Sequence, residues 1–267
     1  MAQANQFTRK AWTLTKKYLL MLLIVFKWIF IMILIGGIFG GAGAFGYFSS
    51  LVQDDPVRDE QTILQEINKN TLTGFVYFND EVTQVGQLRG IDRRLINNLN
   101  EVPKVIRDAV LAVEDDDFYN HFGVDIFSFL RAVKEQLLNE PTQTGGSTIT
   151  QQVARNVFLT LDRTTSRKAK ELLLAIRLER YLSKNEILLA YLNKVPFGNG
   201  ASGYNVYGIK AAAQGIFGLE DLDDINLAQA AYLAGLPQNP TAYSAFDGYG
   251  RFDEPGFNKA VERQRLV

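Results

Sequence analysis

Four consecutive acidic residues, Glu114 to Asp117, end an apolar helical pattern and are the first candidates for chemistry. A carboxylate beside like charges, or partly shielded from water, has a raised pKa and can accept a proton from a hydroxyl group. Glu114 is therefore a candidate general base. A solvated acidic helix end or a divalent cation site explains the same composition equally well, because unusual carboxylates mark functional sites only statistically.

A pair of glycines opens a second polar segment, which runs from Gly145 to Gln152. Glycines let the backbone approach a ligand, and a helix is predicted to begin at Ser147, where free N–H groups would attract phosphate. The amides of Gln151 and Gln152 add neutral hydrogen-bonding groups. The alternative is an ordinary turn with a serine cap. The segment is not a P-loop, because no Lys-Ser or Lys-Thr pair ends the glycine run.

Positive side chains cluster after this segment, and they are Arg155, Arg163, Arg167, Lys168 and Lys170. Several fixed cations can clamp a pyrophosphate. Glu171 lies within the cluster, which would keep its carboxylate ionised and able to hold a metal or orient a cation. A solvated basic helix face, or contact with lipid head groups, is the alternative interpretation.

The composition excludes several classes of site. The chain has no cysteine and one histidine, His121, so a disulfide, a thiol nucleophile and a zinc site are excluded. We expect His121 to hold the loop after the acidic cluster through a structural hydrogen bond. The formal net charge is -1, and no basic face of the kind that binds nucleic acid is present, so no nucleic-acid partner is expected.

The elements that carry these residues are predicted to be mainly α-helical. Apolar residues recur at helical spacing over 102–113, 126–137, 147–157, 166–182 and 226–236. Asp125 is a plausible N-cap, and Ser183 and Glu186 form a capping box before one further helix. The runs 75–78 and 82–88 predict a β-hairpin. The loop 196–207, rich in glycine, asparagine and serine, is predicted to be mobile.

The N-terminal part predicts a membrane anchor. Between Tyr18 and Phe48 the only charged residue is Lys27, and this length suffices to cross a bilayer. Basic residues precede the span and acidic residues follow it, which places the N-terminus in the cytoplasm and the rest outside. A cleaved signal peptide ending near Ala42-Gly43-Ala44 is the main alternative, and the long apolar run disfavours it. A buried core helix is rarely this long without a polar stripe.

Five segments, in the same order, resemble the motifs of the peptidoglycan glycosyltransferase domain found in class A penicillin-binding proteins and in monofunctional glycosyltransferases. They are Glu114–Gly123, Gly146–Gln152, Arg167–Glu171, Lys184–Asn193 and Ala234–Gln238. The resemblance implies a lysozyme-like helical lobe with a smaller membrane-contacting jaw. It also implies an inverting transfer, in which the growing glycan on undecaprenyl pyrophosphate is the donor and lipid II is the acceptor, through the 4-hydroxyl of its GlcNAc.

The resemblance also implies roles for individual residues. Glu114 would be the general base, and Glu171 would assist at the pyrophosphate and is the tentative ligand for Mg²⁺ or another divalent cation. His121 and Asn193 would be structural. The substrate-binding residues would be Asp115, Phe118, Ser147, Thr148, Gln151, Gln152, Arg155, Arg163, Arg167 and Lys168. A long loop from Phe197 to Tyr207, and Leu219 in place of a frequent lysine, depart from the family pattern.

The predicted organisation places a single-pass protein in the cell membrane. Its parts are a cytoplasmic basic tail (1–17), the anchor (18–48), a stalk with a small β region (49–100), the glycosyltransferase domain (101–245), and the start of a linker or a truncated C-terminal region (246–267). The resemblance implies lipid II, the growing glycan and the membrane as partners, and it allows divisome or elongation-complex proteins.

Two other functions are compatible with part of this pattern. A hydrolase that cleaves glycan also uses two carboxylates, but it needs no clamp for pyrophosphate. An inactive membrane-tethered scaffold would not need Glu114 and Glu171, which are both present.

Overall fold

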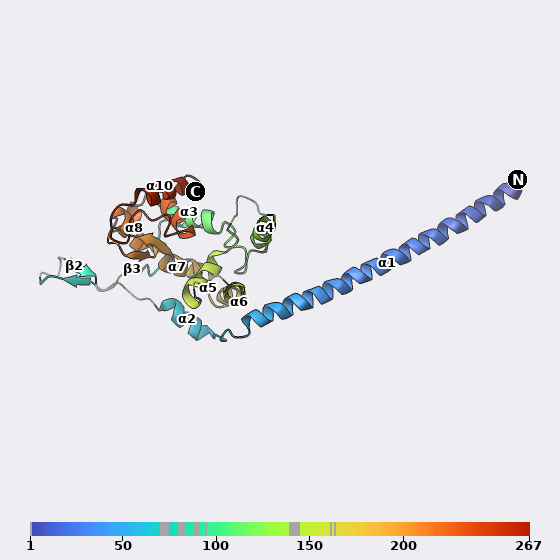
Figure 1. Cartoon of the computed structure of the whole chain (residues 1–267), viewed down its shortest axis with the longest axis horizontal. Coiled ribbons are helices and arrows are strands. Elements are labelled where there is room, and N and C mark those ends of the chain that lie inside the picture. The colour runs from blue at the N-terminus through green and yellow to red at the C-terminus, as the bar shows by residue number, and fades with distance from the viewer. Residues whose placement is uncertain are drawn as a thin grey trace. The chain divides into compact units, whose positions relative to one another are not determined.

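The computed structural model describes residues 2–69, 75–79, 84–87, 91–93, 95–138, 145–160, 162 and 164–267. By its internal contacts the chain divides into two compact units, Met1–Asp55 and Pro56–Val267. The first unit consists mainly of one helix, α1 (Ala2–Val52) (Figure 1).

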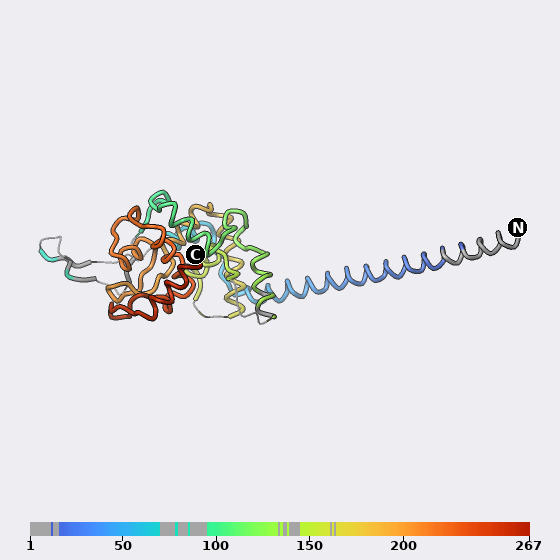
Figure 2. The backbone as a smooth tube through the Cα atoms, turned by 90° about the horizontal axis from the view of Figure 1, so that it is seen from above, coloured from blue at the N-terminus to red at the C-terminus, as the bar shows by residue number. Residues whose placement is uncertain are grey.

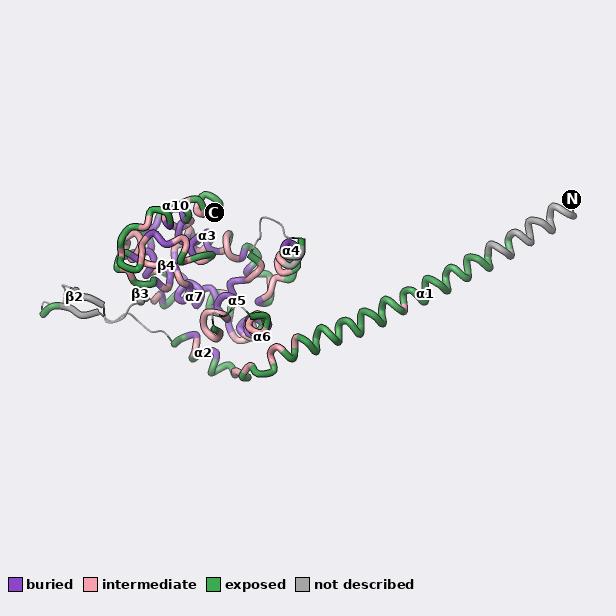
Figure 3. The backbone as a smooth tube through the Cα atoms, in the orientation of Figure 1, coloured by how far each residue is buried: buried purple, intermediate pink, exposed green. Residues whose placement is uncertain are grey.

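Helix α1 is long and apolar enough to cross a membrane over Lys16–Val52. Most of its large apolar side chains are exposed, as the green along the described part of this helix shows (Figure 3), and Phe39 is 75% and Met32 72% exposed. An apolar surface of this extent is unusual on a protein in water and suits the interior of a bilayer. The helix extends beyond both ends of the predicted span at 18–48.

The second unit is mainly helical, as predicted. Its helices are α2 (Glu60–Asn68), α3 (Lys104–Glu114), α4 (Ile126–Leu137), α5 (Ile149–Phe158), α6 (Thr165–Tyr181), α7 (Lys184–Lys194), α8 (Ile209–Phe217), α9 (Leu227–Gly235) and α10 (Glu254–Gln264), with short 3-10 turns at Leu99–Glu101, Leu222–Asp224 and Leu236–Gln238. Seen from above, these helices wind into one body (Figure 2).

Helix α7 forms the centre of this body. Its residues Ile187, Leu188, Tyr191 and Leu192 are at most 1% exposed. It contacts α5, α6 and α8, while α3 and α10 both pack against α9. The predicted capping box at the start of α7 is confirmed, since Ser183 and Glu186 each accept from the other's backbone N–H. Apolar burial on several sides and a well-capped N-terminus therefore fix α7 in the core.

The predicted hairpin is confirmed, because β1 (Phe75–Tyr77) pairs antiparallel with β2 (Gln84–Gln87). The prediction of a mobile loop over 196–207 is wrong. That segment contains β4 (Pro196–Asn199) and β5 (Asn205–Tyr207), and β5 also pairs in parallel with β3 (Ile91–Arg93). Phe197 and Val206 are buried, and Gly198 (φ 85°) and Gly203 (φ 79°) take backbone conformations that favour glycine. Gly198 thus lies at the register irregularity of β4, and Gly203 lies in the turn between β4 and β5.

The segment expected to be a stalk contains α2, which packs on the helical body of the second unit. Ile63 and Ile67 are buried in the main core, and α2 contacts α5. Asp59 caps the start of α2, and the Lys194 ammonium donates to the carbonyl of Lys69 at its end, at 3.1 Å. Residues 60–69 therefore belong to the second unit.

Candidate active site

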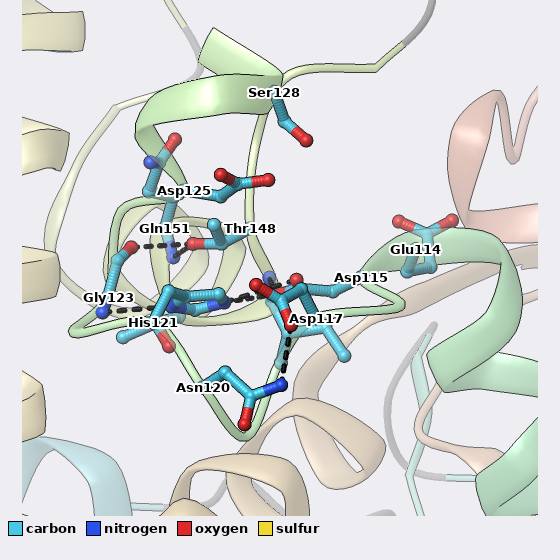
Figure 4. Close-up of polar contacts among 12 residues, drawn as sticks. Glu114, Asp115, Asp117, Asn120, His121, Gly123, Asp125, Ser128, Thr148 and Gln151 are labelled. Carbon is cyan, nitrogen blue, oxygen red and sulfur yellow. Dashed lines mark hydrogen bonds and ion pairs between the residues drawn. The ribbon is translucent and has the colours of Figure 1, made fainter.

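Glu114 is the last residue of α3 and lies at the edge of a cavity of about 310 Å³. In Figure 4 it stands at the end of this helix, just before the loop that carries Asp115 and His121. The cavity lining combines the first two candidate segments with side chains from the C-terminal part of the chain, and includes Asp116, Asp125, Ser128, Arg131, Gly146, Ser147, Thr148, Gln238 and Arg263. A ligand in this cavity can therefore reach Glu114.

The surroundings of Glu114 keep its carboxylate basic. Its Oε2 accepts a hydrogen bond of 2.5 Å from the Gln152 amide. Burial raises the pKa of Glu114 above its ordinary value, while the Gln152 hydrogen bond and the charges of Arg263 and Arg155 oppose this rise. A carboxylate with a raised pKa accepts a proton more readily, which suits a general base.

Asp115, a member of the acidic cluster, and His121 are joined by a hydrogen bond within the loop that follows α3. The Asp115 carboxylate accepts from His121 Nε2 at 3.0 Å and from the backbone N–H of Ile149 at 2.8 Å. His121 Nδ1 accepts from the N–H of Gly123, at 3.0 Å, so the hydrogen bond to Asp115 requires the tautomer with a proton on Nε2 (Figure 4). These contacts join the loop to the start of α5.

Phe118 differs from the prediction that it contacts substrate. Its ring is 1% exposed and lies beneath the loop, with the Lys184 ammonium 4.6 Å from the ring centre. A ring buried to this extent offers no face to a ligand. Phe118 instead supports the loop through packing and a cation–π contact.

The second polar segment has its N-cap one residue after Ser147, and α5 begins at Ile149. Thr148 is the N-cap of α5, since its hydroxyl accepts from the N–H of Gln151 and donates to the carbonyl of Gly123. The N–H groups of Ile149 and Gln151 therefore already have partners within the protein. The Ser147 hydroxyl, which is not needed as a cap, accepts from the Lys168 ammonium at 2.7 Å.

Glu171 forms ion pairs with two members of the cationic cluster. Its side chain is fully buried, and its two oxygens accept from Arg167 at 2.7 Å and from Lys168 at 2.5 Å. The Lys168 ammonium also donates to Gln151 Oε1 at 2.9 Å. Burial lowers the pKa of Lys168, and the Glu171 carboxylate counteracts that shift. The pair of cations is thus fixed beside the start of α5.

A second polar chain leads from Arg155 to Glu114. Arg155 contacts Gln152 Oε1 at 3.5 Å, and Gln152 donates to Glu114. Gln152 is nearly buried, so its orientation is fixed by these neighbours. Adjacent amides of α5 thus serve two polar groups: Gln152 joins Arg155 to Glu114, and Gln151 accepts from Lys168 of α6.

Comparison with known proteins identifies the family. The family described as Transglycosylase matches residues 80–267. The chain belongs to this family. It is 40% identical over 220 residues to penicillin-binding protein 1A of Pseudomonas aeruginosa, covering 81% of the chain and 25% of that protein. It is 36% identical over 245 residues to penicillin-binding protein 1A of Clostridium perfringens, covering 90% and 34%. It is 38% identical over 238 residues to penicillin-binding protein 1A/1B of Bacillus subtilis, covering 88% and 23%.

The predicted glycosyltransferase domain covers residues 101–245. The transglycosylase match is longer at both ends and covers residues 80–267. The chain spans about a quarter to a third of the length of these relatives. Helix α10, which lies beyond residue 245, packs against α9 and carries Arg263 into the cavity wall.

Asn193 of the transglycosylase is predicted to have a structural role, and its contacts suit that role. Asn193 is nearly buried and exchanges two hydrogen bonds of 2.9 Å with the backbone of Ile96, which joins α7 to the segment before α3. Arg163 lies outside the described residues. The structure brings together the cavity residues and the cluster around Glu171, while Phe118 is turned into the core.

A metal at Glu171 does not fit this arrangement. Both oxygens of Glu171 already accept from cations. Among the described residues, no group of three or more His, Cys, Asp or Glu side chains could hold a metal ion. The general expectation of Mg²⁺ or another divalent cation stays a prediction.

Sequence reasoning missed Arg131 and Arg263 and did not assign a role to Gln238, although all three line the cavity. Gln238 belongs to the last of the five motifs, so a signal for it was present. Arg263 is one of several cations in a charged C-terminal stretch, and nothing local distinguishes it from Arg265. Only the packing of α10 on α9 brings it to the cavity.

Proposed function

We propose that this chain is a peptidoglycan glycosyltransferase that polymerises lipid II into glycan strands and releases undecaprenyl pyrophosphate. The observation that carries the proposal is Glu114, which lines the cavity and accepts from Gln152. The Lys168 ammonium, paired with Glu171, donates to Ser147 of the same cavity lining. Membership of the transglycosylase family and the similarity to penicillin-binding proteins 1A support it.

In the proposed reaction, Glu114 takes the proton of the 4-hydroxyl of the GlcNAc of lipid II. The hydroxyl oxygen then attacks the anomeric carbon of the growing glycan, and the bond from that carbon to the pyrophosphate breaks. A single displacement inverts the configuration at this carbon. The leaving pyrophosphate carries the negative charge that develops, and Arg167 and Lys168 stabilise it.

The roles of the other predicted residues are part of this proposal. Ser147, Thr148, Gln151, Gln152 and Arg155 shape or orient the donor side. Asp115 acts through the loop, because its oxygens are occupied by His121 and Ile149.

The test is polymerisation of purified lipid II by the full chain. Wild type should give glycan polymer, and Glu114→Gln should lower the rate by about 10²–10⁴-fold, which is the usual contribution of a general base. Glu262→Gln, an exposed change on α10, is the control and should keep full activity. Shortening of preformed glycan would instead identify a hydrolase, and no reaction with intact binding would identify a scaffold.

We also propose that the N-terminus is cytoplasmic and the second unit is outside the cell membrane. The basic residues before the apolar part of α1 and the acidic residues after it support this orientation. Both proposed substrates are lipid-linked, so the membrane surface is a partner of the reaction. Divisome or elongation-complex proteins remain a prediction from the resemblance alone.

A further inference from the structure

Arg263 reaches the same cavity as Glu114 from the opposite end of the sequence. It lies in the last turn of α10 and lines the cavity together with Glu114 and Gln238. Both α3, which ends at Glu114, and α10 pack against α9. Helix α9 therefore joins the element that carries the proposed base to the element that carries this cation.

The Arg263 side chain packs closely against Gly235, the last residue of α9. A Cβ atom at this position would lie 2.9 Å from Arg263 Cγ, which is closer than such atoms normally approach. The absence of a side chain lets the apolar stem of Arg263 pass over the end of α9. The stem of Arg263 is thereby packed against the end of α9.

The Arg263 Nε atom is buried and has no hydrogen-bond partner within the described part of the chain. Burying a polar group without a partner costs free energy. A surface arginine with a purely solvating role would not need this position. The placement is better explained if the charge acts on a group in the cavity.

The charges around the cavity indicate that the group on which Arg263 acts is the Glu114 carboxylate. The loop and α4 bring the acidic side chains Asp115, Asp116 and Asp125 to the same cavity. The opposing cations are Arg131 of α4, which is exposed and donates to Ser128, Arg155 of α5, and Arg263 of α10. Tyr191 of α7 also interacts electrostatically with the Glu114 carboxylate.

Among the cations, Arg263 has the strongest effect on Glu114. Burial and the Asp115 charge raise the pKa of Glu114, whereas the Gln152 hydrogen bond, then Arg263 and then Arg155 lower it. Arg155 also contacts Gln152. Arg263 therefore supplies a counter-charge that does not depend on the α5 amides.

We propose that Arg263 is a positioning residue that keeps Glu114 ionised and oriented from the C-terminal side of the cavity. The proposal rests on the function proposed above for the role of Glu114 as a base. It assigns a part in the active site to a helix that the motifs do not include.

The first test measures the ionisation of Glu114 without any turnover. The full chain, labelled with ¹³C in its glutamate carboxyl groups, is titrated by NMR, and the signal missing in Glu114→Gln identifies Glu114. Arg263→Gln and Arg263→Met, which keeps an apolar stem, should move the titration midpoint of Glu114 to higher pH. Arg263→Lys should restore most of the original midpoint. Arg265→Gln, an exposed change at the end of the same helix, should leave it unchanged.

The second test is the pH profile of kcat/KM for lipid II. A base must be deprotonated, so a higher midpoint moves the acidic limb of the profile to higher pH, and each pH unit of displacement lowers the rate on that limb about tenfold. Arg263→Gln should therefore lose activity mainly at acidic pH and regain it at alkaline pH, and Arg263→Lys should rescue the loss.

An unchanged Glu114 midpoint in folded Arg263→Gln and Arg263→Met would overturn the proposal. An increase in KM that is equal at all pH values, with no change in midpoint, would also overturn it, because Arg263 would then bind substrate directly. If the midpoint moves but wild type does not polymerise lipid II, the proposed function fails while the link between Arg263 and Glu114 stands.

Discussion

Glu114 weakens the fold at neutral pH for the same reason that it can act as a base. Its pKa is raised by burial, so the folded state binds its proton more tightly than the unfolded chain does. By linkage, this group contributes stability below its unfolded pKa, and that contribution is lost as the pH rises through the folded pKa. At neutral pH the ionised carboxylate is therefore held in the protein at a cost.

We expect Glu114→Gln to be more stable than wild type at neutral pH, because the amide removes a buried charge and can still accept from Gln152. The difference in melting temperature should shrink when both proteins are compared near pH 4, where the wild-type carboxyl is protonated. Thermal unfolding at the two pH values measures this, with the exposed Glu262→Gln as control. Equal melting temperatures at neutral pH would contradict the prediction.

Glu171 has the opposite effect on stability, since it neutralises two cations. We expect Glu171→Gln to lower the free energy of unfolding by about 3–5 kcal/mol, because removal of one partner leaves the other charges of a buried ion pair uncompensated. Lys168 is a third exposed and Arg167 less, so the lower end of this range is the better expectation. Urea unfolding measures the change, and Glu220→Gln, an exposed change in a loop, is the control. A loss no larger than the control's would show that water already screens the cluster.

At the scale of elements, the contact between α4 and the start of α5 depends on one of two adjacent glycines. A Cβ atom at Gly146 would lie 2.7 Å from Ala132 Cβ and 3.2 Å from the carbonyl of Ser128, both on α4. A Cβ atom at Gly145 would meet nothing within 4 Å. The pair therefore offers a matched comparison on the cavity wall.

We expect Gly146→Ala to destabilise the protein by about 1–3 kcal/mol, the usual cost of overpacking, and to lower activity, because α4 must move away from Ser147. Gly145→Ala should leave stability and activity close to wild type. Urea unfolding and the lipid II assay measure both effects. Equal behaviour of the two variants would mean that α4 adjusts without cost.

The elements also show which features a sequence can predict. The capping box of α7 and the hairpin of β1 and β2 were predicted, because their signals lie within a few residues of each other. The β3–β5 pairing joins residues 114 positions apart in a parallel register, and no local pattern encodes it. The N-cap of α5 lies one residue after the expected Ser147. Ser147 and Thr148 are both good caps, and the contact with Gly123 favours Thr148.

The same reasoning explains the site. Glu114, Glu171 and the cations could be chosen from residue type and order, because charge and motif are properties of the sequence. The burial of Phe118 and the approach of Arg263 depend on how α7 and α9 pack, which is a property of the folded body.

At the scale of the whole molecule, the proposed topology can be tested cleanly because the chain has no cysteine. We expect a cysteine at Ser202, an exposed position of the second unit, to react with a membrane-impermeant thiol reagent in intact spheroplasts. A cysteine at Asn5 should react only after lysis. The reverse pattern would place the catalytic unit in the cytoplasm.

Because other helices enclose α7, hydrogen exchange of its amides can report the global unfolding of the second unit. Its amides lie in the centre of the core, between α5, α6 and α8, so solvent can reach them only when most of that body comes apart. Local openings near α4, whose Phe127 is 85% exposed, would not release them. Native-state hydrogen exchange of α7 would therefore report the global free energy of unfolding, whereas exchange of α4 would report smaller, local openings.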